Sequence, residues 1–155
     1  MGWAVIERRG GNLGALGYGL IETAPSELSQ RLRQIGAKIE GLIEEFRPDR
    51  LAVERQIFGA NRTTALDVAK ATGVALYVAA AHEIQVTEYL PNEIKLCICG
   101  NGRADKKQVE YMVMRLAKLA TRPRPDDVAD AIAIALTDAL RLRPSGEMTL
   151  PGNAK

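Results

Sequence analysis

The sequence has few of the residues that build disulfides and zinc sites. Its 155 residues include two cysteines and one histidine. Cys97 and Cys99 are separated by one residue, which is too close for an ordinary disulfide. With no cluster of cysteine or histidine nearby, they are also too few to hold zinc. We therefore expect two reduced, partly buried thiols.

Long hydrophobic runs and a strong charge excess are also missing. There is no run of about 18 or more apolar residues and no leader with a cleavage site, so the sequence predicts no membrane span and no secretory signal. We expect a cytoplasmic protein. The net charge of +2 indicates a polyanionic partner only if the positive charges gather on one surface. A composition of 46% hydrophobic and 26% charged residues is that of one ordinary globular domain.

Hydrophobic periodicity predicts a hairpin followed by alternating helices and strands. The hairpin joins residues 3–7 and 18–21 through a glycine-containing turn. The expected helices are 25–46, 63–81, 92–98, 105–119 and 126–142, and the further strands are 51–54 and 86–89. This order favours an α/β sheet covered by helices. We expect one domain over residues 1–143 and a disordered tail over 144–155.

Three carboxylates enter the last predicted helix at its start. Asp126 is expected to be the N-cap, where an acid interacts favourably with the helix dipole. Asp127 and Asp130 share one face and repel each other by about a few tenths of a kcal/mol. The same face soon continues with Ala131 and Ile134, so the two acids lie at the start of a helix that is otherwise expected to be packed. Two alternatives remain: ordinary solvated acids of a helix start, or ligands of a site.

Glu54 adds a third acid to that pair. It ends a predicted buried strand, and ligands of open α/β sheets bind beyond the carboxyl ends of strands. A salt bridge to Arg55 is the plain alternative. If Glu54, Asp127 and Asp130 converge, their repulsion requires a cation, and hard oxygen ligands suit Mg²⁺ or Mn²⁺. Such a cluster indicates metal-assisted phosphoryl chemistry.

Basic residues surround another predicted helix start. Arg103, Lys106 and Lys107 precede or enter a helix capped by Asp105, where lysines oppose the helix dipole. A phosphate bound there would gain from the backbone N–H groups and the lysines together. The alternative is a pair of solvated lysines on a polar face.

Three aromatic residues have different expected roles. Phe58 lies in the loop after Glu54, where it either covers the core or stacks on an unpaired base. Trp3 and Tyr77 are expected in the core.

Three segments carry the most distinctive residues of the chain: LAVERQIFGAN (51–61), YLPNEIKLCICGNGRADKKQVEYMV (89–113) and PDDVADAIAIALT (125–137). In this order and at these separations, they resemble the RuvC family of Holliday junction resolvases. GRADKKQV and the pattern D-x-x-D-A-I-A-I-A are the most specific pieces, and the resemblance runs from about residue 2 to 142. It implies a ribonuclease H-like mixed sheet flanked by helices, a homodimer, and Mg²⁺-dependent cutting of four-way DNA junctions in recombination and repair, with two ions per subunit in the intact family member and Mn²⁺ as a substitute. A branch-migration motor complex is a further partner implied by the family.

The resemblance also implies roles for single residues. Glu54, Asp127 and Asp130 fall on metal-site and catalytic acids, and Lys95 and Lys106 fall on basic residues that face DNA, with Lys107 beside the second. The family often has an aromatic residue three positions after the glutamate; here Ile57 stands there and Phe58 follows.

One family feature is absent from the sequence. Members of the family begin with a strand ending in G-x-D-P-G, whose aspartate is a central metal ligand, and this sequence contains no D-P-G. We expect a sheet whose first central strand is missing, as in a fragment, a chain with a misplaced start or a shortened homologue. A catalytically inactive protein that binds branched DNA is therefore the alternative to an active endonuclease. A third hypothesis is an α/β domain unrelated to DNA whose acids are only helix caps.

Overall fold

The computed structural model describes residues 1–55 and 62–142, except for the side chains of 62–65. Its elements follow the predicted order. The strands are β1 (Gly2–Arg9), β2 (Asn12–Leu20), β3 (Arg50–Glu54) and β4 (Gln85–Tyr89), and the helices are α1 (Leu28–Phe46), α2 (Arg62–Ala81), α3 (Pro91–Cys99), α4 (Lys106–Leu116) and α5 (Asp126–Arg141). The predicted α/β class is confirmed. β1 extends beyond both predicted ends, and β2 begins at Asn12, well before the predicted residue 18.

The described strands form two separate sheets. β1 and β2 are antiparallel, with a register shift between Val5 and Ile6, and β3 and β4 are parallel. Parallel strands need a crossover connection, and α2 lies between β3 and β4 in the chain. β1 and β3 are not hydrogen-bonded to each other. The expectation of a missing central strand stays a prediction.

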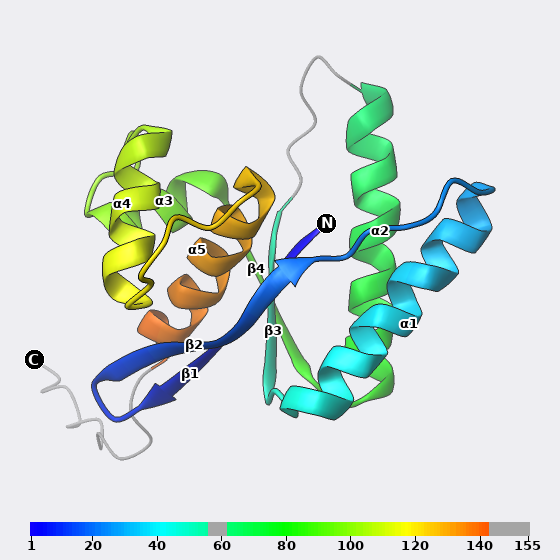
Figure 1. The fold of residues 1–155 in the computed structure, drawn as a ribbon, viewed down its shortest axis with the longest axis horizontal. Coiled ribbons are helices and arrows are strands. Elements are labelled where there is room, and N and C mark those ends of the chain that lie inside the picture. Colours follow the sequence, from blue (N-terminus) through cyan, green and yellow to red (C-terminus); the bar gives the residue numbers. More distant parts are fainter. Residues whose placement is uncertain (56–61, 143–155) are drawn as a thin grey trace, which may run out of the picture.

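Helices cover the strands on both sides (Figure 1). Neighbouring strand residues point to opposite faces: Leu51 packs with the cluster of α1 and α2, whereas Ala52 packs with the cluster centred on α5. The second cluster is the larger one, and Ile132 and Leu136 at its centre have 0% of their surface exposed. The unbroken apolar run of α5 is therefore explained by its position between the hairpin and α3–α4.

Some sequence predictions concern residues outside this description. Phe58 lies in the segment 56–61, so its two alternative roles stay open, and the tail 144–155 also stays a prediction. No helix within residues 1–55 and 62–142 is long and apolar enough to cross a membrane.

One core prediction is wrong: Tyr77 is 75% exposed, because it lies on the face of α2 opposite the buried Ala71, Ala75 and Val78.

Candidate active site

Glu54 lies at the carboxyl end of β3, as predicted. It pairs with Tyr89 of β4, and the following Arg55 N–H donates to the Tyr89 carbonyl. Burial raises the pKa of the half-buried Glu54, and the negative charge of Asp130 raises it further. The alternative role of Glu54, a salt bridge to Arg55, is not supported, because Arg55 Nε lies 4.0 Å from Glu88 Oε2 instead. Glu54 thus ends its strand near an acid of α5.

Asp127 and Asp130 lie in the first turns of α5, and both are exposed. Partial burial of the Asp130 carboxylate raises its pKa, the charge of Lys106 lowers it, and the charges of Asp127 and Asp126 raise it again. Raised pKa values on two neighbouring acids, Glu54 and Asp130, mean that the fold disfavours their ionised forms. A bound cation would remove that penalty.

Asp126 is not the N-cap that the sequence predicted. Pro125 occupies the cap position without a side-chain hydrogen bond, and Asp126 is the first helical residue. Its Oδ2 lies 2.8 Å from Lys106 Nζ and its Oδ1 lies 3.6 Å from Arg124 Nη1. The hydrogen bond from Lys106 lowers the pKa of Asp126 and raises that of Lys106. Asp126 therefore joins α5 to the start of α4, because a tertiary ion pair has replaced local capping.

The predicted basic residues divide into two groups. Lys106 lies with the acids, where its charge acts on Asp130. Lys107 lines a pocket formed by the end of α3, the following loop and α4, Arg103 is exposed in that loop, and Lys95 is partly buried on α3. The Asp105 cap is confirmed, since its carboxylate accepts from the Gln108 N–H and the Gln108 side chain accepts from the Asp105 N–H. Only Lys106 of this set is brought directly to the carboxylates.

The predicted site acids are chemically suitable ligands for a divalent metal ion. Glu54, Asp127 and Asp130 supply hard oxygen donors, and two of them carry raised pKa values that a cation would reverse. Within residues 1–55 and 62–142, however, no three acidic, histidine or cysteine side chains lie close enough together to hold an ion. The described residues therefore provide suitable donor atoms, but they do not by themselves form a complete metal-binding cluster.

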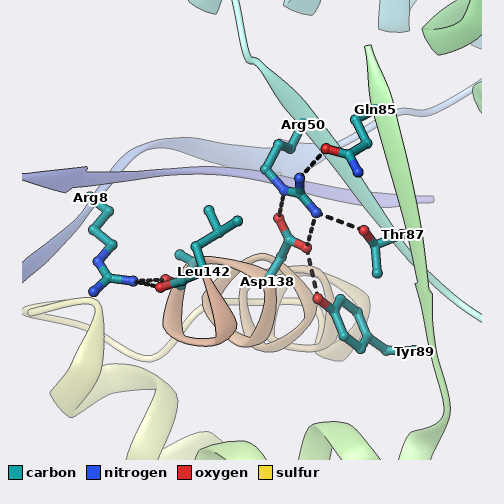
Figure 2. A network of polar contacts seen from close by, with 8 residues as sticks. Arg8, Arg50, Gln85, Thr87, Tyr89, Asp138 and Leu142 are labelled. Atoms are coloured by element: carbon teal, nitrogen blue, oxygen red, sulfur yellow. Dashed lines mark hydrogen bonds and ion pairs between the residues drawn. The ribbon is translucent and has the colours of Figure 1, made fainter. Parts of the chain in front are cut away.

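A buried polar network joins β3 and β4 to α5 (Figure 2). Asp138 accepts hydrogen bonds from Arg50 Nε at 2.8 Å and from the Tyr89 hydroxyl at 2.7 Å, and Arg50 Nη2 also donates to Thr87 at 2.8 Å. Asp138 has 6% of its surface exposed. These bonds fix the strand that carries Glu54 against the helix that carries Asp130.

Sequence reasoning missed this network. Asp138 reads as the return of a polar stripe after the apolar run of α5, and nothing in its local sequence marks it as buried. The pairing depends on Arg50, which is 88 residues away in the chain. A basic residue at the start of a buried strand was the only available signal, and it did not identify the partner.

Comparisons with known proteins agree on one family. The sequence profile described as "Crossover junction endodeoxyribonuclease RuvC" matches residues 1–138. A curated relative of that name from Chloroflexus aggregans is 46% identical over 141 residues, which are 90% of this chain and 85% of the relative. The relative from Alkaliphilus metalliredigens is 41% identical over 140 residues, with the same two coverages.

Solved structures show the same relationship. The Thermus thermophilus RuvC structure aligns with a TM-score of 0.79 at 33% identity, covering 88% of this chain and 84% of that one. The structure of T. thermophilus RuvC in complex with Holliday junction substrate aligns with a TM-score of 0.83 at the same identity and coverages. The comparisons thus agree with the ribonuclease H-like fold.

Proposed function

Because the chain belongs to the RuvC family of crossover junction endodeoxyribonucleases, we propose that it resolves four-way DNA junctions by metal-dependent hydrolysis of phosphodiester bonds. The observation that carries the assignment to these residues is the proximity of Glu54 and Asp130, whose charges interact although they belong to β3 and α5. Two acids of like charge from separate elements gain nothing in stability from lying near each other.

The proposed site uses Glu54, Asp127 and Asp130 as metal ligands. Bound Mg²⁺, or Mn²⁺ in its place, would supply a water of lowered pKa and stabilise the leaving oxygen; two ions per subunit are expected. The carboxylates would hold the ions, and they would remain ionised at neutral pH because a cation offsets their repulsion. In the proposal, the Arg50–Asp138–Tyr89 network keeps β3 and α5 at a fixed separation.

Basic residues complete the proposed site. Lys106 lies beside the acids, where its ammonium would contact a phosphate oxygen next to the reacting bond. Lys95, Arg103 and Lys107 lie farther along α3, the following loop and α4, where they would hold the DNA backbone. Phe58, in the loop after β3, stays a prediction for base stacking.

A four-way junction requires two coordinated cuts, so we propose a homodimer. The exposed face of α2 presents Leu66 at 49% and Tyr77 at 75%, and these residues, eleven positions apart, lie in one line along the helix. Tyr77→Glu should shift the molar mass measured by light scattering towards the monomer. Tyr111→Glu, a matched change at a tyrosine of α4 exposed at 61%, should not. A Tyr77→Glu protein of unchanged mass would exclude this face.

Two further parts of the proposal rest on the family alone. A branch-migration motor would be a partner, and the protein would act in the cytoplasm, where it meets its DNA. The alternative, a catalytically inactive protein that binds branched DNA, is not supported by the comparisons, because the matched profile and relatives are described as endodeoxyribonucleases.

The test is cleavage of a labelled four-way junction in Mg²⁺ and in Mn²⁺. The chain should be compared with a version extended by a family-like strand ending in G-x-D-P-G, each with and without Glu54→Gln. Glu88→Gln is the matched control, because Glu88 is an exposed acid on the neighbouring strand β4. Cleavage abolished by Glu54→Gln and kept by Glu88→Gln would support the proposal. Junction binding without cleavage by either version would favour the catalytically inactive protein that binds branched DNA.

A further inference from the structure

Gly2, at the start of β1, lies directly against the first turn of α5. A Cβ atom built on Gly2 would lie 2.0 Å from the backbone oxygen of Asp127, 2.5 Å from its carbonyl carbon and 3.1 Å from the backbone nitrogen of Val128. Real Cβ atoms essentially never lie within 3.0 Å of heavy atoms outside their own and the adjacent residues. The absence of a side chain at residue 2 is therefore what allows this approach of strand and helix.

Neither side of this contact can move freely. Met1 and Ile21 exchange backbone hydrogen bonds of 2.8 and 3.1 Å, so the pairing of the two hairpin strands continues past Gly2 to Met1. On the helix side, Val128 and Ala129 are each 2% exposed, and Val128 belongs to the core cluster around Ile132. The obstacle at Gly2 is backbone, which cannot rotate away as a flexible side chain would.

We propose that Gly2 is a positioning residue that sets the place of Asp127 and Asp130 relative to Glu54. The inference rests on the proposed function of these three carboxylates. To reach ordinary van der Waals contact of 3.4 Å, an added methyl group must push the Asp127 carbonyl away by at least about 1.4 Å. A displacement of about 1 Å at a catalytic constellation can cost roughly 10²-fold in rate.

The test compares Gly2→Ala with Gly14→Ala. Gly14 lies on the other strand of the same hairpin, and a Cβ there would meet nothing within 4 Å, so the control adds the same methyl group without the clash. Mn²⁺ affinity, measured by calorimetric titration, should fall at least about tenfold in Gly2→Ala and stay unchanged in Gly14→Ala. In junction cleavage, the loss in kcat should exceed any rise in KM, because the displaced Asp127 and Asp130 are the proposed metal ligands, whereas Lys95, Arg103 and Lys107 lie outside α5.

The contact can also be tested without a substitution. In the unaltered protein, an NMR Overhauser effect should connect the Gly2 Hα protons with the Val128 amide proton, which tests the contact whether or not Gly2→Ala folds. Absence of that effect, or a Gly2→Ala protein with wild-type Mn²⁺ affinity, would overturn the inference.

Failure of the proposed function gives a different result. Mn²⁺ affinity unchanged by both Glu54→Gln and Asp127→Asn would mean that the carboxylates are not metal ligands, and the inference would fall with them. If those two substitutions abolish binding while Gly2→Ala does not, the metal site stands and only the positioning role of Gly2 fails.

Discussion

Asp138→Ala should destabilise the protein strongly, although it lies outside the proposed active site. The side chains of Arg50 and Asp138 are 19% and 8% exposed, and removing one partner of a buried ion pair costs about 3–5 kcal/mol because it leaves the other charge unpaired. Arg50 keeps Gln85 and Thr87 as acceptors, which reduces that cost. The buried Tyr89 hydroxyl loses its acceptor, a loss of about 1–3 kcal/mol. Since both effects come from one carboxylate, we expect about 3 kcal/mol in total.

Urea unfolding followed by fluorescence measures this loss. Trp3 is the only tryptophan, and its ring centroid lies 5.9 Å from that of Phe46, so its emission reports on packing between β1 and α1. The unfolding midpoint should fall at constant m-value. Asp138→Asn keeps one hydrogen-bond acceptor without the charge, so its loss should be smaller, about 1–2 kcal/mol.

Asp67→Ala is the matched control for Asp138→Ala. It removes an exposed partner of Lys70, with both side chains about half exposed, and should change stability by less than about 1 kcal/mol. If Asp138→Ala changed the free energy of unfolding no more than Asp67→Ala does, the network would contribute no stability and the reasoning would be refuted.

Three further predictions concern titration and DNA binding. Burial and the hydrogen bond to Asp138 raise the pKa of Tyr89 to about 12; because the neutral form is favoured in the fold, stability present below pH 10 should be lost as pH rises towards 12. Tyr89→Phe should remove that part of the pH dependence in urea unfolding, and an unchanged profile would contradict the assignment. At pH values above 5 and without metal, Asp130→Asn should stabilise the fold by about a few tenths of a kcal/mol, seen as a small rise in melting temperature. The same change should weaken Mn²⁺ binding. A lower melting temperature would show that the acid stabilises the fold. Lys106→Ala should reduce the slope of log K against log salt for junction binding by about 0.9, and an unaltered slope would mean that Lys106 contacts no phosphate.

Local sequence predicted the elements well because their signals are local. Apolar residues at steps of three and four identified α1, and the short apolar run before Glu54 identified β3. The Asp105 cap could also be predicted, since capping depends on residues three apart. Tyr77 was assigned wrongly because an aromatic residue in an Ala-rich helix does not reveal which face of that helix is covered.

Residue type and spacing by themselves predicted that Glu54 ends a strand and that Asp127 and Asp130 share one face of a helix. The motifs of the three segments added a resemblance to one family. Partners distant in the chain were decided only by tertiary packing. The Asp138–Arg50 pair, the Asp126–Lys106 pair and the contact of Gly2 with Asp127 each join elements whose separation is set by the core between them. No periodicity encodes such pairs, because the free energy that selects them comes from burial, charge and backbone approach in the folded state.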